Sequence, residues 1–108
     1  MARFTIRAAQ STDLDAIMGL EHACFPSDAW SEQSMRDELS ALHTSYFVVL
    51  KTEPERSGYE VIGYAGLAKL EGSEQSDVQT IAIAQQARGL GLGRRLMQHL
   101  IAEAQRQG

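Results

Sequence analysis

The sequence contains little cysteine and no long apolar run. Cys24 is the single cysteine among 108 residues, which excludes an internal disulfide and a cysteine-rich metal site. No apolar stretch approaches the roughly 20 residues that cross a bilayer, and no charged segment followed by an apolar one opens the chain. We therefore expect a cytoplasmic protein that makes no membrane contact.

Metal-ligand spacing and excess positive charge are also missing. His22, His43 and His99 have no spacing typical of a metal site, so we expect no metal and interpret them as surface or helix-packing residues. A net charge of −4 argues against general nucleic-acid binding and suits a partner with a basic, flexible N-terminus. The length is enough for one domain with a modest core.

The most informative segment is a glycine-rich one. A strand-like run over residues 78–84 is followed by Arg88 and then by glycine at positions 89, 91 and 93. Alternate glycines let the backbone turn without Cβ atoms in the way, so several N–H groups can point at one anion before a helix. The pattern predicts a phosphate or pyrophosphate site. The alternative is a glycine-rich turn that binds no ligand.

An amphipathic helix is predicted directly after this turn, over residues 91–107. Its apolar residues recur at four-residue steps and form a stripe along one face of the helix, which two further apolar residues widen. Arg88, Arg94 and Arg95 are expected to offer charge to peripheral phosphates, while main-chain N–H groups supply the pocket itself. The stripe consists of Leu92, Leu96, Leu100 and Ala104, widened by Met97 and Ile101.

The motifs of three other classes of glycine-rich loop do not match this segment of the sequence. A P-loop needs four residues between its glycines and then Gly-Lys-Ser/Thr, and no such lysine follows. A dinucleotide fingerprint needs a third glycine where Arg94 stands, and an acid about 20 residues later. A kinase glycine loop lies in a hairpin and does not open a helix.

The pattern Arg-x-x-Gly-x-Gly over residues 88–93 resembles the pyrophosphate loop of the GCN5-related N-acetyltransferases (GNAT). The resemblance implies acetyl-CoA as co-substrate. It also implies that the strand before the loop offers main-chain groups to the amide-bearing arm of CoA, and that one strand N–H donates to the thioester oxygen. The implied cofactor-binding residues are Ile81, Ala82, Ile83, Arg88, Gly89, Leu90, Gly91, Leu92, Gly93 and Arg94.

Two further segments resemble one subgroup of this family. Phe25-Pro26 followed by Trp30-Ser31, together with residues 77–82, is similar to the bacterial RimI-type enzymes. That likeness implies transfer of an acetyl group to the N-terminal alanine of a ribosomal protein, so the expected partner is a protein N-terminal peptide. Phe25, Pro26 and Trp30 allow two interpretations, as the wall of an acceptor groove or as core aromatics between two helices.

The pattern of the whole chain predicts an α+β fold with the order β-α-α-β-β-β-α. The resemblance implies the GNAT fold, a mostly antiparallel sheet flanked by helices, in one N-acetyltransferase domain over residues 1–108. Thr12 or Asp13 is expected to cap the first helix and Ser31 the second. Predicted strands cover 3–8, 45–51, 59–70 and 77–84, predicted helices cover 12–23, 31–41 and 91–107, and a hairpin loop covers 71–74.

Amide formation requires removal of a proton from an ammonium group and protonation of the departing thiolate. In RimI-type enzymes the glutamate base and the tyrosine acid follow the glycine-loop helix, so by resemblance both lie beyond Gly108 and no catalytic residue is expected within the chain. We therefore expect a C-terminally incomplete domain. Its strand over 77–84 would keep an unpaired edge through which a dimer could form.

Other residues within the chain could act as a catalytic base or nucleophile, but their residue types give only weak support for such a role. Glu21, Glu38, Glu74 and Asp77 are acids, but acids on helix surfaces and hairpin loops are usually only solvated, and Asp77 fits the start of a strand. Cys24 has no basic neighbour in sequence, which predicts a buried, unreactive thiol. Two functional alternatives stay open, a catalytically silent CoA-binding module and a GNAT enzyme that acetylates a small-molecule amine.

Overall fold

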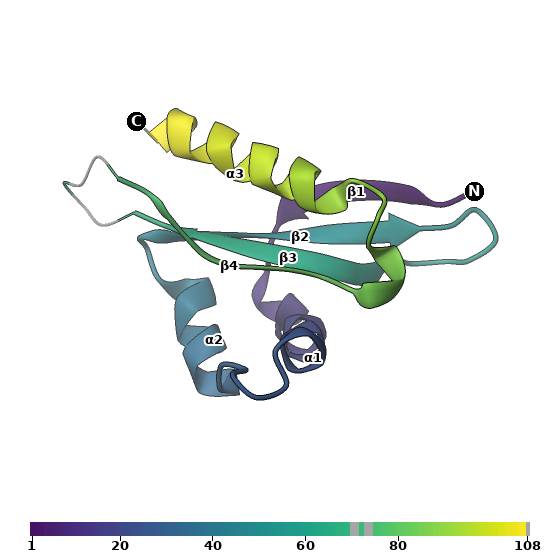
Figure 1. Ribbon diagram of the computed structural model, residues 1–108, viewed down its shortest axis with the longest axis horizontal. Coiled ribbons are helices and arrows are strands. Elements are labelled where there is room, and N and C mark those ends of the chain that lie inside the picture. The colour runs from purple at the N-terminus through teal and green to yellow at the C-terminus, as the bar shows by residue number, and fades with distance from the viewer. Residues whose placement is uncertain (70–71, 73–74, 108) are drawn as a thin grey trace.

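The structure is a computed structural model that describes residues 1–69, 72 and 75–107. Its centre is an antiparallel sheet with the strand order β1-β2-β3-β4, so each strand pairs with its neighbour in sequence. Helices α1 and α2 cover one face of the sheet and α3 covers the other (Figure 1). The elements are β1 Arg3–Ala8, η1 Ser11–Asp13, α1 Leu14–Cys24, α2 Glu32–Ser40, β2 Thr44–Thr52, β3 Glu60–Ala68, β4 Asp77–Ile83, η2 Gln85–Ala87 and α3 Leu92–Gln107.

The predicted class and the predicted order of elements are confirmed. Most boundaries agree within two residues, because the apolar periodicity of each segment sets its length. Ser31 caps α2 as expected, since its Oγ accepts a hydrogen bond from the Ser34 N–H at 3.1 Å. The third strand ends at Ala68. Apart from Gly72, the predicted hairpin loop over 71–74 lies outside the described residues.

The two central strands are apolar and are covered on both faces. Residues 46–50 of β2 and 62–67 of β3 are buried, which fits their content of β-branched and aromatic side chains. Tyr46 lies opposite Gly66 in the strand register, and a Cβ at Gly66 would come within 2.3 Å of the Tyr46 ring. The glycine therefore makes room for the tyrosine ring on one face of the sheet.

The Tyr46 hydroxyl connects the sheet to α2. It donates a hydrogen bond of 2.9 Å to the Glu38 carboxylate. Burial raises the pKa of Tyr46 well above its ordinary value, and the Glu38 carboxylate raises it further. The hydroxyl therefore stays protonated and keeps donating across the physiological pH range.

The start of the first helix differs from the expectation that Thr12 or Asp13 caps it. A short 3₁₀ turn, η1, precedes α1, and the Asp13 side chain makes no hydrogen bond to the first turn of α1. Instead Asp13 accepts a bond from the Gln10 N–H at 2.7 Å and two from the Arg7 guanidinium, at 2.8 and 3.0 Å. The buried Asp13 carboxylate thus holds η1 against β1.

This ion pair predicts a pH dependence of stability. The hydrogen bonds from Arg7 are the main cause that holds the pKa of Asp13 below its ordinary value. A depressed pKa in the folded state gives stability that is present above the unfolded pKa, about 3.9, and is lost as the pH falls through the folded pKa. We expect Asp13→Asn to lower the free energy of unfolding by about 2 kcal/mol near neutral pH and to flatten its fall in acid.

Urea unfolding at several pH values between 2 and 7 measures this effect. Glu32→Gln is the matched control, because Glu32 pairs with Arg36 at 3.4 Å between two exposed side chains, and exposed pairs contribute little. An Asp13→Asn chain that keeps the acid slope of the wild type would contradict the assignment.

Helix α3 packs on the sheet through the predicted stripe. Leu92, Leu96 and Leu100 are buried, whereas Ile101, predicted to widen the stripe, is exposed. The His99 ring meets the Phe47 ring edge-on, with 4.5 Å between ring centres. His99 is therefore a helix-packing residue as predicted, and His22 and His43 lie at the surface.

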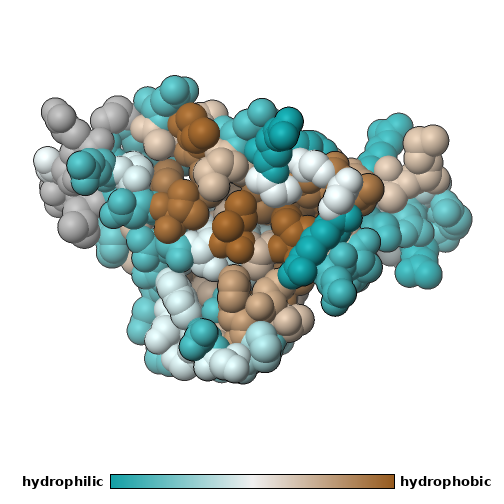
Figure 2. Space-filling model, viewed as in Figure 1, coloured by the Kyte–Doolittle hydropathy of each residue, from teal (hydrophilic) through white to brown (hydrophobic). Residues whose placement is uncertain are grey.

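The last strand of the sheet is paired on one side only. β4 pairs with β3, and within the described ranges no strand lies along its other edge (Figure 1). Hydrophobic side chains gather in the middle of the face shown in Figure 2, over β4 and the adjoining side of α3. Val78 of β4 is among the exposed apolar residues. A dimer through this edge stays a prediction.

Candidate functional site

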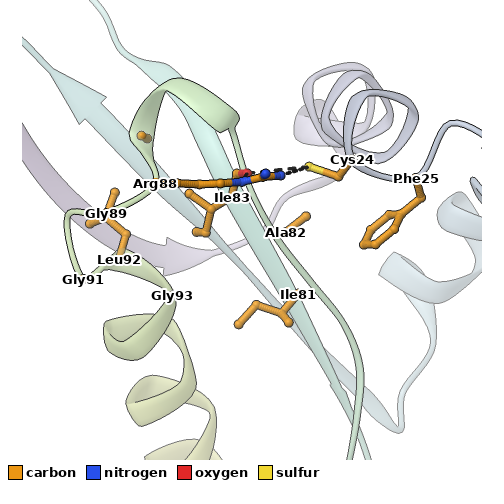
Figure 3. Close-up of a pocket in the computed structure, with 11 residues that line it drawn as sticks. Cys24, Phe25, Ile81, Ala82, Ile83, Arg88, Gly89, Gly91, Leu92 and Gly93 are labelled. Carbon is orange, nitrogen blue, oxygen red and sulfur yellow. Dashed lines mark hydrogen bonds between the residues drawn. The ribbon is translucent and has the colours of Figure 1, made fainter.

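A pocket of about 490 Å³ lies where β4 passes into the glycine turn and α3, opposite the end of α1 (Figure 3). It contains most of the residues that the sequence predicts for the cofactor. Leu90 and Arg94, which are both exposed, do not line it. The lining residues are Cys24, Phe25, Ile81, Ala82, Ile83, Ala87, Arg88, Gly89, Gly91, Leu92 and Gly93.

The glycine turn leaves its backbone open towards this pocket. Gly89 and Gly91 have φ angles of 84° and 77°, in the left-handed region that side chains disfavour. A Cβ at Gly89, Gly91 or Gly93 would meet nothing within 4 Å. The glycines are therefore required by backbone conformation at 89 and 91, and all three keep free the space that a ligand would need to reach the main chain.

Helix α3 begins at the wall of this space. Its first hydrogen bond runs from the Arg95 N–H to the Gly91 carbonyl at 3.1 Å. The N–H groups before Arg95 have no partner inside the helix, and the helix dipole adds positive potential at the same end. Backbone donors and helix dipole together suit a phosphate or pyrophosphate.

Arg88 joins the two walls of the pocket. Its Nε donates to the Ile83 carbonyl at 3.1 Å, and its Nη2 lies 3.7 Å from the Cys24 Sγ (Figure 3). The Cys24 Sγ in turn lies 3.6 Å from the Ile83 carbonyl oxygen. The expectation of a buried thiol without a basic neighbour is therefore wrong, because folding brings together two residues 64 positions apart.

The other two arginines do not reach this pocket. Arg94 is exposed and does not line it. Arg95 points the other way, and its Nη2 donates to the Phe4 carbonyl of β1 at 3.3 Å. Of the three arginines expected to serve peripheral phosphates, only Arg88 lines the pocket in this structure.

One of the candidate acids, Glu21, is buried in the fold and is not solvated at the surface. Glu21 is 2% exposed, and its carboxylate accepts hydrogen bonds from the Trp30 N–H at 2.9 Å and from the Tyr64 hydroxyl. The interpretation of Glu21 as a surface acid is therefore wrong. The helical period carries a signal that could have revealed it, because Glu21 continues the buried stripe of Leu14, Ile17 and Met18.

The other two candidate acids that the structure describes, Glu38 and Asp77, are less buried than Glu21. Glu38 accepts the Tyr46 hydroxyl, and Asp77 is the exposed first residue of β4, as predicted. Glu74 lies outside the described residues. In the described part of the chain no group of three or more His, Cys, Asp or Glu side chains could hold a metal ion.

A second pocket, of about 430 Å³, shares Phe25 and Ile81 with the first. Phe25 and Trp30 are only partly buried and Pro26 is exposed, so none of the three is a fully buried core residue. Residues of α1, of the loop after it and of β4 line this pocket, namely Glu21, Phe25, Asp28, Trp30, Val78, Gln79, Thr80 and Ile81.

The described helices include none with the length and apolar character that a membrane span requires.

Structural comparison shows the same fold in several acetyltransferases. The ribosomal-protein-S18-alanine N-acetyltransferase from Escherichia coli aligns with a TM-score of 0.79 and 24% identity, over 98% of this chain and 62% of that one. N-acetylglutamate synthase from Neisseria gonorrhoeae, solved with coenzyme A and N-acetyl-glutamate, aligns with a TM-score of 0.78 and 23% identity. The alignment covers 100% of this chain and 24% of that one. Aminoglycoside N-acetyltransferase AAC(6')-Iy in complex with CoA aligns with a TM-score of 0.78 and 18% identity. The alignment covers 100% of this chain and 73% of that one.

Sequence comparison identifies the family. The N-alpha-acetyltransferase RimI of Mycobacterium tuberculosis is 31% identical over 100 residues, which cover 90% of this chain and 60% of that protein. The chain thus spans about three fifths of the length of the two RimI-type relatives. The model of the Acetyltransferase (GNAT) family matches residues 14–108. With its sheet order, its glycine turn and this match, the chain belongs to the GNAT acetyltransferase family.

Proposed function

We propose that this chain contributes the cofactor-binding part of an acetyl-CoA-dependent N-acetyltransferase. The observation that carries the proposal is the first pocket, where the open glycine turn and the start of α3 adjoin the apolar residues of β4. The pyrophosphate would lie against the N–H groups of the turn, with Arg88 as the adjacent positive charge. Ile81, Ala82 and Ile83 would hold the uncharged arm of the molecule.

Acetyl-CoA fits this site by its chemistry. One end of it is anionic and suits the backbone donors, and the rest of its chain carries amides that a strand can bind through main-chain groups. Bound there, it would supply the acetyl group as an activated thioester. The chain's own contribution is to bind and align that group, because an amine and a thioester react faster once both are held in place.

The proposed acceptor is the N-terminal α-amine of a protein, in particular a ribosomal protein that begins with alanine, in the cytoplasm. The 31% identity to a RimI protein supports this choice. Partly exposed Phe25 and Trp30 beside the second pocket give a peptide a surface to contact. A small-molecule amine is the rival acceptor, and the aminoglycoside enzyme shares the fold.

The proton-transfer residues are proposed to lie outside these 108 residues. Among the described acids, Glu21 and Glu38 are already engaged by hydroxyl or amide donors, and neither lines the cofactor pocket. A general base must reach the amine within hydrogen-bonding distance. The chain alone would then bind acetyl-CoA and transfer nothing, as a silent module also would.

Isothermal titration of the chain with acetyl-CoA, beside a thiol-release assay with an alanine-first peptide, tests the proposal. S-acetylpantetheine, which lacks the pyrophosphate, is the control ligand and should bind much more weakly. Equal affinity for the two compounds, or no binding of acetyl-CoA, would refute the cofactor assignment. Thiol release by the chain alone would show that a base exists within it.

A further inference from the structure

The outer edge of β1 is the second edge of the sheet at which another strand could pair. Within the described ranges β1 pairs with β2 alone, and Figure 1 shows it beside α3. The Ala9 N–H, just after β1, donates to the Tyr46 carbonyl of β2 at 2.8 Å. Residues of an antiparallel strand alternately bond their neighbour and point away from it. The main-chain groups of Phe4, Ile6 and Ala8 therefore point away from β2, where an added strand could bind them.

Two arginine side chains cover part of this edge. The Arg95 Nη2 donates to the Phe4 carbonyl at 3.3 Å, and the Arg7 Nη1 donates to the Ala8 carbonyl at 3.0 Å. Neither guanidinium bonds to Ile6, the outward-pointing residue between them. Arg95 is exposed and its acceptor is neutral, so a stronger acceptor could replace the Phe4 carbonyl. The cap that Arg95 forms on the edge is therefore exchangeable.

A groove of about 530 Å³ lies between this edge and α3, and we call it the β1–α3 groove. Among the described residues, its lining includes Arg95 and no acid. Side chains alternate between the two faces of a strand. Every second side chain of a strand added to β1 would therefore lie on the side of this groove. The lining consists of Phe4, Thr5, Ile6, Arg95, Gln98, His99 and Ala102.

Positive charge borders the edge of β1 on both faces of the sheet. Arg95 lies on the face that α3 covers, and exposed Arg3 shares the other face with Arg7, because side chains alternate along β1. In the described part of the chain, no ion pair includes Arg3 or Arg95. The whole chain has a net charge of −4, so this edge is a local exception. Its charge favours an acidic ligand.

We propose that the edge of β1 and the β1–α3 groove bind an extended acidic segment of a partner protein, which joins the sheet as a strand beside β1. A carboxylate accepts from a guanidinium more strongly than a neutral carbonyl does. An acidic side chain in the groove would therefore draw Arg95 away from Phe4, and the Phe4 carbonyl would accept a main-chain N–H of the added strand. A neutral segment would displace Arg95 and gain no ion pair in exchange. This site lies at the opposite edge of the sheet from the cofactor pocket and does not depend on the proposed function.

Two capped peptides test the selection by charge, one of alternating glutamate and valine and one of alternating glutamine and valine. Alternation places all glutamates on one face of the strand, from which they can reach Arg95. Isothermal titration of the wild type should give at least about tenfold tighter binding of the glutamate peptide, because an ion pair replaces a neutral contact. In Arg95→Gln this preference should fall to about threefold or less, since the other cations are exposed and screened.

Arg94→Gln is the matched control for Arg95→Gln. Arg94 precedes Arg95 in α3, is exposed and does not line the β1–α3 groove. The preference for the glutamate peptide should stay within about twofold of the wild-type value in this variant. Equal affinity of the wild type for the two peptides, binding of neither peptide, or an equal loss of preference in both variants would overturn the proposal.

Amide hydrogen exchange followed by NMR shows where the peptide binds. Saturating glutamate peptide should slow the exchange of the Phe4, Ile6 and Ala8 amides by at least about tenfold, because their N–H groups gain acceptors. Protection along β4 without protection along β1 would place the peptide at the wrong edge and refute the assignment. A fully N-methylated glutamate peptide keeps its charge but has no main-chain donors, so it should bind at least about tenfold more weakly. If it binds as tightly as the parent peptide, attraction between charges explains the binding and strand addition is excluded.

Discussion

The Gly91→Val chain is expected to lose acetyl-CoA binding, with an affinity at least about a hundredfold lower than that of the wild type, or nearly 3 kcal/mol. At Gly91 a Cβ would meet no protein atom within 4 Å, so a side chain there occupies the open side of the turn that lines the pocket. A branched side chain would keep the pyrophosphate away from the backbone N–H groups. Isothermal titration measures the change.

The same substitution also strains the backbone, and Gly58→Val controls for that. Gly91 and Gly58 have φ angles of 77° and 79°, and neither has an atom near its Cβ position. Each valine should cost about 1–2 kcal/mol of stability through this conformation. Gly58 lies in the turn between β2 and β3 and lines no part of the first pocket. Loss of binding in both variants, or in neither, would contradict the assignment of the glycine turn.

The Gly66→Ala chain is expected to be less stable than the wild type by about 3 kcal/mol, the upper range for overpacking a core. A Cβ at Gly66 would lie 2.3 Å from the Tyr46 ring. The ring cannot turn away freely, because Tyr46 is buried and its hydroxyl is bonded to Glu38. The clash therefore pushes either β3 out of register with β2 or α2 away from the sheet.

Gly19→Ala is the matched control for that variant. Gly19 lies within α1, is exposed and has nothing within 4 Å of its Cβ position. Alanine there should raise the free energy of unfolding by roughly 0.5–1 kcal/mol, because glycine is a poor helix residue. Urea unfolding measures the free energy of unfolding of both variants. A Gly66→Ala chain as stable as the wild type would show that the Tyr46 ring moves without cost.

The sequence predicted what depends on short-range pattern. Apolar periodicity gave the four strands and three helices, and alternate glycines located the turn before α3. Most of the predicted cofactor residues lie within two short segments, 81–83 and 88–93, so the first pocket is largely a local structure that a sequence motif can describe.

What the sequence did not predict depends on contacts between distant positions. Arg88 reaches Cys24 across 64 positions, Glu21 accepts from Tyr64 across 43, and Arg95 reaches Phe4 across 91. Such pairs form only when helices settle on a particular face of the sheet, and residue type alone does not fix that arrangement. The negative charge of the second pocket became visible only with the fold.

The one-sided pairing of β4 has a consequence for hydrogen exchange. β2 and β3 have strands on both sides, so their amide protons should exchange only when much of the molecule unfolds. β4 is bonded to β3 alone, and it can detach by local opening at a lower free energy. Since Ile81, Ala82 and Ile83 lie on β4, one wall of the first pocket belongs to an edge strand, and a ligand bound there would slow the exchange of β4 more than that of the other edge strand, β1.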